Sequence, residues 1–161
     1  CLLYYYRYLL FFQIGDYDHC SRDTMRNIEV LDFTNKYFPP ELCASLEQYR
    51  PYILRMHFMA DALGTIDSGG ELPEALAILA EGSSSIKELP DMAKNKIFLL
   101  EQKNSLRAIK ELRQQLLRML PPDPLSELRE KLAEAIANED YEEAARLRDS
   151  LQKKEDRNEA S

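Results

Sequence analysis

The side chains that could bind a metal or act as acid and base gather in the first part of the sequence. Asp16, Asp18 and Asp23 surround His19, and carboxylates and imidazole suit divalent metals. Each acid has a simpler explanation. Asp16 follows a glycine and stands where an N-cap would begin a helix, while Asp18 and Asp23 are five residues apart, which does not place them on one helix face. We expect no metal site and no catalytic site here.

The cysteines show no pattern of metal ligands. Cys1, Cys20 and Cys43 contain no CxxC pair, and Cys20 stands next to His19, so these two side chains would point apart on a helix. Reduced thiols in or near a core are the simpler interpretation, and they favour a cytoplasmic protein without a cofactor. An enzyme of unrecognised type is a third hypothesis, and it would need a pocket with perturbed carboxylates near His19 or His57.

A basic segment could contact nucleic acid. Residues 94–118 contain seven basic residues and only two acids. A solvated helix face, paired with the acidic C-terminal segment, is the simpler interpretation. The alternative is a contact to phosphates through Lys103, Arg107, Lys110 and Arg113. No aromatic residue is interleaved with these side chains, and the net charge of the chain is −7. Nucleic acid is therefore not the expected partner.

The C-terminal segment has the pattern of two short helices. In the first of them, Leu128, Leu132 and Ile136 recur at helical spacing and form one apolar face. Asp140 then begins a second helix with the D-x-x-E spacing of a capping box. The alanines at 144 and 145 would allow the two helices to approach closely. The pattern predicts an antiparallel hairpin over residues 125–153.

The second helix of this hairpin carries a motif. Residues 139–149 read EDYEEAARLRD, an acidic turn, an aromatic residue, two alanines and then Leu-Arg-Asp. The segment resembles the UVR domain, a helical hairpin of the B and C subunits of the bacterial nucleotide-excision repair nuclease. The resemblance implies a protein-docking hairpin, but similar hairpins occur in activators of protein-arginine kinases and in protease adaptors. The residues expected to contact a partner are Leu128, Leu132, Ile136, Tyr141, Ala144, Ala145, Leu147, Arg148, Asp149 and Leu151.

The composition favours an all-α fold. The chain of 161 residues has 25 Leu and 14 Ala but one Val and three Thr, so we expect helices over at least roughly 70% of it and no substantial sheet. Glycine, proline and capping residues divide it into predicted helices at about 1–13, 17–36, 41–49, 51–67, 71–89, 91–120, 124–138 and 141–153. We expect a helical domain over 1–120, a proline-rich boundary at 121–124, the hairpin over 125–153 and a polar, frayed tail at 154–161.

Several faces of these helices can be predicted. The apolar first helix is expected to be a buried core helix, since 14 residues interrupted by Arg7 are too few to span a membrane. The chain begins with Cys and not with Met, so we expect an excised piece of a longer chain or a processed product. Charged Arg22, Asp23 and Arg26 are expected to face solvent. The 91–120 helix is expected to bury Leu99, Leu106, Ile109, Leu112, Leu116 and Leu120.

Three segments share the order helix, small or acidic turn, helix. They are Leu9–Leu31, Met59–Ile86 and Leu132–Leu151, and the Gly-Asp-Tyr turn of the first looks like that of a tetratricopeptide-type unit. Such units bury their apolar faces against neighbours. We therefore expect helical hairpins in a tetratricopeptide-like array, with an irregular helical bundle as the alternative.

The sequence predicts a helical protein-interaction scaffold or adaptor without catalysis of its own. A bacterial, cytoplasmic protein whose UVR hairpin docks a protein partner fits best, with no membrane contact, and the sequence leaves homo-oligomer formation open. The alternative is an accessory of nucleotide-excision repair, or of another nucleic-acid complex, that uses the basic helix over 94–118.

Overall fold

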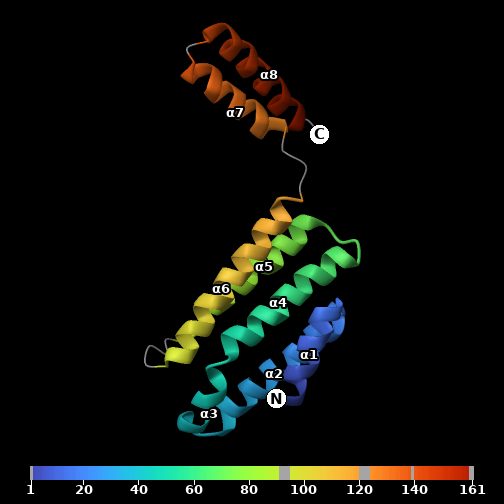
Figure 1. Cartoon of the computed structure of the whole chain (residues 1–161), viewed down its shortest axis with the longest axis vertical. Helices are drawn as coiled ribbons and strands as arrows, with labels where there is room; N and C mark the ends of the chain where they lie inside the picture. The colour runs from blue at the N-terminus through green and yellow to red at the C-terminus, as the bar shows by residue number, and fades with distance from the viewer. Residues whose placement is uncertain (1, 91–94, 120–123, 139, 160–161) are drawn as a thin grey trace. The chain divides into compact units, whose positions relative to one another are not determined.

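The computed structural model describes residues 2–90, 95–119, 124–138 and 140–159 (Figure 1). In these described ranges eight α-helices make up 87% of the residues, and there is no strand. The prediction of an all-α fold is confirmed. The chain divides into two compact units, Cys1–Leu117 and Arg118–Ser161.

The described residues of unit 1 form six helices. Their bounds are α1 Leu2–Ile14, α2 Tyr17–Tyr37, α3 Pro40–Glu47, α4 Arg50–Asp67, α5 Leu72–Lys87 and α6 Lys96–Leu117. α1 packs on α2, and α4 packs on α5, so the first two predicted hairpins are present. Figure 1 shows α4 between α2 and the pair formed by α5 and α6, and all three helices contact it.

The turn between α1 and α2 forms as the sequence predicts. Gly15 has φ +80°, a conformation that favours glycine. Asp16 is the N-cap of α2, and its Oδ1 accepts the backbone N–H of His19 at 3.3 Å. The cap fixes the point where the chain reverses, so α2 returns along α1.

The core of unit 1 has two parts. The larger part lies among α4, α5 and α6, where Leu79, Ile86 and Ile109 are at most 2% exposed. The smaller part joins α1, α2 and α4 around Tyr8 and Cys20, both fully buried. Since α4 contributes to both parts, it is the central helix of the unit.

α1 is not the buried core helix that its composition predicts. Tyr8 is completely buried, but the exposed fractions of Leu3, Leu10 and Ile14 are 86%, 60% and 73%. The reason is that α1 packs on α2 and α4 along one side only. No described helix of unit 1 covers its outer face.

The buried face of α6 also differs from the predicted one. Ile109, Leu112 and Leu116 are buried as expected, but Leu99 is 41% exposed and Phe98 is 2% exposed. α6 begins at Lys96 because the Asn95 side chain accepts the backbone N–H groups of residues 97 and 98. The face set by Ile109 then continues back through Ser105 and Phe98. Leu106 is half-buried, whereas Leu120 lies outside the described residues.

Unit 2 is an antiparallel pair of helices, α7 Pro124–Ala137 and α8 Tyr141–Glu159. The third predicted hairpin is therefore present. α8 continues past Lys153, where the apolar pattern of the sequence ends. No helix among the described residues is long and apolar enough to cross a membrane.

Candidate functional site

The turn of the unit 2 hairpin is closed by backbone and side-chain hydrogen bonds. The backbone N–H of Asp140 donates to the carbonyl of Ala135 at 2.9 Å, and that of Asn138 donates to Glu134 at 3.0 Å. The Asp140 side chain accepts the backbone N–H of Glu143 at 3.1 Å. Asp140 therefore caps α8, as the D-x-x-E spacing predicts.

The contact between α7 and α8 is built on two alanines. Ala135 and Ala144 are 8% and 9% exposed, the lowest values in the described part of unit 2. α7 is the other helix of this unit, so Ala144 lies in the helix contact that its small size permits. Sequence reasoning placed Ile136 on this face and missed Ala135. The spacing from Leu128 through Leu132 to residue 135, four and then three residues, is the signal that could have found it.

The residues predicted to contact a partner fall into two groups. Leu128, Leu132, Leu147 and Leu151 flank the alanine contact and keep an intermediate exposure. The others are exposed: Ile136 at 55%, Tyr141 at 70%, and Ala145, Arg148 and Asp149. The hairpin thus presents a partly exposed row of leucines, here called the seam, formed by Leu128, Leu132, Leu147 and Leu151. The exposed apolar side chains of Ile136 and Tyr141 lie at its turn.

Arg148 and Asp149 form an ion pair at the surface. The distance from Arg148 Nη2 to Asp149 Oδ1 is 2.9 Å, and both side chains are about two-thirds exposed. An exposed pair of this kind contributes little to stability. Both groups are therefore accessible to a partner.

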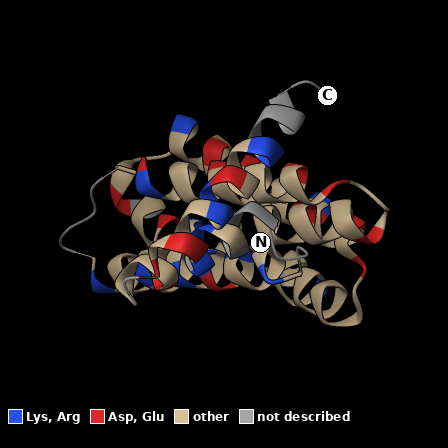
Figure 2. Cartoon of the chain, turned by 90° about the horizontal axis from the view of Figure 1, so that it is seen from above, with Lys and Arg blue, Asp and Glu red and all other residues tan. Residues whose placement is uncertain are grey.

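The predicted basic contact residues lie on α6 and are all exposed. They are Lys103, Arg107, Lys110 and Arg113. Arg107 lies 3.8 Å from Glu111, one turn further along the helix. Figure 2 shows Lys and Arg interspersed with Asp and Glu along the ribbons. The exposed row is present, but acids stand among the basic groups.

The acids near His19 do not converge on one point. Asp16 Oδ1 lies 2.7 Å from His19 Nδ1, and this hydrogen bond lowers the pKa of Asp16. Asp18 is exposed, and Asp23 is held by other residues. The described residues contain no group of three or more side chains of the metal-binding type.

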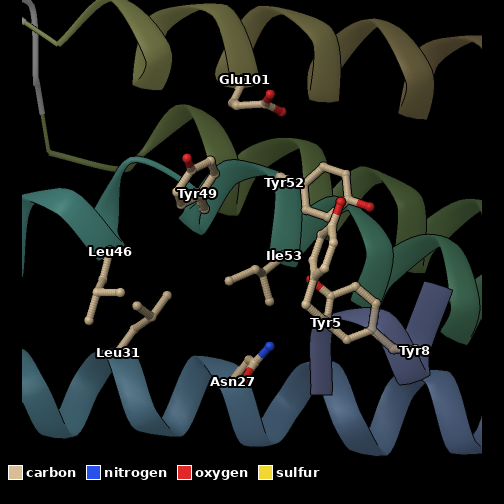
Figure 3. A pocket seen from close by; sticks show the side chains of 9 residues that line it. All are labelled: Tyr5, Tyr8, Asn27, Leu31, Leu46, Tyr49, Tyr52, Ile53 and Glu101. Atoms are coloured by element: carbon tan, nitrogen blue, oxygen red, sulfur yellow. The ribbon is translucent and has the colours of Figure 1, made fainter. Parts of the chain in front are cut away.

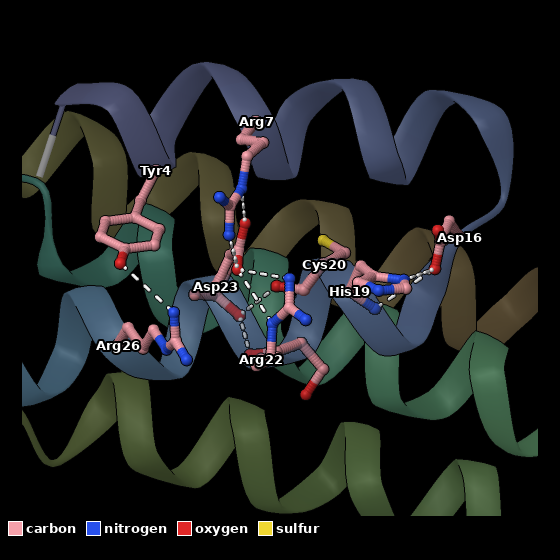
Figure 4. Close-up of polar contacts among 10 residues, drawn as sticks. Tyr4, Arg7, Asp16, His19, Cys20, Arg22, Asp23 and Arg26 are labelled. Carbon is pink, nitrogen blue, oxygen red and sulfur yellow. Dashed lines mark hydrogen bonds and ion pairs between the residues drawn. The ribbon is translucent and has the colours of Figure 1, made fainter.

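Asp23 corrects a prediction, because its carboxylate is completely buried and does not face solvent. Arg7 donates from Nε at 2.5 Å and from Nη2 at 2.6 Å, and Arg22 adds bonds at 3.2 Å (Figure 4). These guanidinium groups hold the pKa of Asp23 below its ordinary value. The pair ties α1 to α2 in the middle of their contact.

A second buried polar link joins α2 to α4. His57 Nδ1 lies 3.2 Å from Ser21 Oγ and 3.3 Å from Thr24 Oγ1, and its Nε2 lies 3.5 Å from Asp61. Asp61 borders a pocket of about 300 Å³, but Ser21 and His57 do not line it. The hydroxyl and the carboxylate therefore do not meet over one cavity, and the chain of contacts ties two helices together.

Comparison with protein families agrees with the geometry of unit 2. Residues 123–157 match the family model of the UvrB/uvrC motif, which confirms the resemblance seen in the sequence. No curated protein and no solved structure gives a significant match to the chain. The C-terminal helical hairpin is a UVR motif, a non-catalytic motif that mediates protein interactions in UvrB/UvrC-type proteins.

Proposed function

We propose that the protein is a helical adaptor whose UVR hairpin docks a partner protein and that has no catalytic activity of its own. The observation that carries the proposal is the half-covered seam of unit 2. Leu132 and Leu147 remain partly exposed, whereas Leu79 and Ile86 of the α4–α5 hairpin are fully buried. α6 packs against the α4–α5 hairpin. A partner that supplies further helices would cover the seam in the same way.

The exposed residues at the turn extend this surface. Ile136 and Tyr141 add apolar area, and the Arg148–Asp149 pair adds polar groups that can orient a partner. We also propose that the protein is bacterial and cytoplasmic and that unit 1 is a tetratricopeptide-like array. The free, buried thiols of Cys20 and Cys43 support the location.

The test uses the full chain as bait for quantitative capture from the source cell. The double variant Ile136→Ser/Tyr141→Ser changes two exposed side chains, so the helices should persist by circular dichroism. We expect it to lose most of the partner, while the control Lys103→Gln/Lys110→Gln on α6 keeps it. If both variants capture the same proteins as the unchanged chain, the docking proposal fails. Light scattering identifies the case in which the partner is a second copy.

The second candidate is an accessory of nucleotide-excision repair or another nucleic-acid complex. The observation that favours it is the exposed basic row on α6. Binding through phosphates would weaken steeply with salt. Titration of labelled DNA at two salt concentrations tests it, and Lys103→Gln/Lys110→Gln should then reduce the affinity. DNA binding that is unaffected by this variant would exclude α6 as the contact.

A further inference from the structure

A pocket of about 430 Å³ opens in unit 1. Its polar and aromatic lining consists of Tyr5, Tyr8, Asn27, Tyr49, Tyr52 and Glu101. Leu31, Leu46 and Ile53 supply aliphatic surface. In Figure 3, Glu101 of α6 lies at one edge and Asn27 of α2 at the other. The pocket thus combines π faces, an apolar wall and one carboxylate.

The tyrosines form a connected cluster. The ring centroids of Tyr5 and Tyr52 are 5.9 Å apart, and those of Tyr5 and Tyr8 are 5.6 Å apart. Burial raises the pKa of Tyr52 to about 12, so its phenol is neutral at physiological pH. Tyr49 is 46% exposed, which leaves its ring accessible to a ligand. Neutral aromatic faces attract organic cations.

Glu101 brings a negative charge to these rings. Within the part of the chain that the structure describes, its carboxylate has no ion pair or hydrogen bond. Arg50, which follows Tyr49 in the sequence, does not line the pocket and is already paired with Asp32 at 2.7 Å and with Glu47 at 2.6 Å. Arg55 covers the Tyr52 ring at 4.5 Å but does not line the pocket. A cation that enters the pocket would therefore find a carboxylate available.

Elsewhere in unit 1, an arginine side chain already contacts an aromatic ring and a carboxylate at the same time. Arg7 binds the carboxylate of Asp23, and its guanidinium carbon lies 5.1 Å from the centroid of the Tyr4 ring. Arg26 also lies over Tyr4, at 5.8 Å. The planar guanidinium stacks on rings while it pairs with a carboxylate, which a lysine ammonium does less well. Ring and carboxylate together therefore favour arginine as the occupant.

We propose that the tyrosine pocket of unit 1 binds an arginine side chain presented by a partner polypeptide. The guanidinium lies between the Tyr49 ring and the Glu101 carboxylate, and the aliphatic stem contacts the apolar wall. All residues of this site belong to unit 1, and the proposal does not depend on the docking function proposed for the UVR hairpin.

The test compares two blocked tripeptides, glycine-arginine-glycine and the same peptide with citrulline, which is nearly isosteric and neutral. Binding to the full chain is followed by NMR on the tyrosine rings. We expect the arginine peptide to bind about ten-fold more tightly. Glu101→Gln should weaken it about three- to five-fold, and Tyr49→Leu should do so to a similar degree. The matched control Glu111→Gln, on the same helix but outside the pocket, should leave the affinity unchanged.

Three results would overturn the proposal. The first is equal affinity for the two peptides, which would make the pocket a purely apolar site. The second is a loss with Glu111→Gln as large as that with Glu101→Gln, which would show non-specific attraction to acids. The third is binding of free butylguanidinium without binding of the arginine peptide, which would assign the pocket to a small molecule.

Discussion

The α4–α5 hairpin and the α7–α8 hairpin are built alike but differ in what surrounds them. Each has a small residue in a helix contact: Gly82 in α5, which faces the Phe58 side chain, and Ala144 in α8. α4 and α5 also contact α6, and α4 contacts α2. α7 and α8 form a unit of two helices. The comparison teaches that the number of neighbouring helices, rather than the local sequence pattern, decides how much of a hairpin's apolar face is buried.

The contact between Gly82 and Phe58 shows how closely α4 and α5 pack. A Cβ at Gly82 would lie 2.6 Å from Phe58 Cγ, which real structures essentially never allow. The contact atoms are at the base of the Phe58 side chain, so a small rotation cannot relieve the clash. The contact between α7 and α8 has room for the side chain of Ala144. The α7–α8 pair is therefore packed less closely at this point than the α4–α5 pair is at Gly82.

The largest expected effect is the loss of stability when a leucine of each hairpin is truncated. Leu79→Ala removes a fully buried side chain among three helices and should cost about 2–5 kcal/mol of unfolding free energy. Leu132→Ala changes a partly exposed side chain, and we expect about half of that cost or less. Urea denaturation with segment-resolved hydrogen exchange measures both. Equal costs would contradict the difference in burial.

The next effect compares two arginine–aspartate pairs. Arg7→Met leaves the buried Asp23 with Arg22 alone, and it should lower the melting temperature at pH 7 clearly more than Arg148→Met, which breaks an exposed pair. The pKa of Asp23 is lowered in the folded state. Its contribution is therefore present above the ordinary aspartate pKa of about 3.9 and is lost as the pH falls through the folded pKa.

Thermal scans across this range provide the check. As the pH falls below about 4, the melting temperatures of the unchanged chain and of Arg7→Met should converge, because protonated Asp23 no longer forms an ion pair with the Arg7 guanidinium. A difference that stays constant between pH 7 and pH 2 would show that the aliphatic stem of Arg7, and not its charge, accounts for the stabilisation.

A smaller effect is expected within α8, where two adjacent alanines have different surroundings. Ala144→Leu should overpack the helix contact and cost about 1–3 kcal/mol. Ala145→Leu places the same side chain on an exposed position and should change stability by at most about 0.5 kcal/mol. Hydrogen exchange should show lost protection over residues 124–153 for the first variant only, with unit 1 unchanged. Unchanged protection with Ala144→Leu would disprove the close contact.

The smallest expected effect applies to both hairpins alike. Addition of a chelator should leave the melting temperature unchanged, since the described residues contain no cluster of metal-binding side chains. Differential scanning calorimetry with and without the chelator measures this. A drop of several degrees would reveal a metal that stabilises one of the units.

The sequence predicts the helices well because their boundaries depend on local chemistry. Asp16 and Asp140 cap helices where their spacing indicates, and the prolines at 40, 51 and 73 stand in first turns. The UVR motif is equally local, since its residues are contiguous. Such features need no knowledge of the tertiary fold.

Burial is harder to predict because it depends on distant neighbours. The composition of α1 suggests a core helix, but the helix has a neighbour on one side only. In the sequence Asp23 appears as a solvent-facing charge and Arg7 as an interruption of an apolar helix, yet each lies eight residues from Gly15, one before it and one after. A hairpin that reverses at this glycine places them opposite each other. This symmetry is the signal that could have indicated the pair.

The pocket in unit 1 was beyond prediction for the same reason. Its tyrosines come from α1, α4 and the residue before α4, and Glu101 comes from α6. No linear spacing links these positions. The aromatic richness of α1 was visible in the sequence, but the cavity depends on how α1, α2, α3 and α6 are arranged around α4.

The order of helix contacts in unit 1 has a consequence for how the chain reaches its native state. The principal contacts join each helix to the next one or two along the chain, so native pairs are close in sequence and few long loops must close. Topologies of this kind fold quickly, on the order of microseconds to milliseconds. The α1–α2 hairpin, closed by Gly15 and Asp16, can assemble while later helices are still emerging from the ribosome.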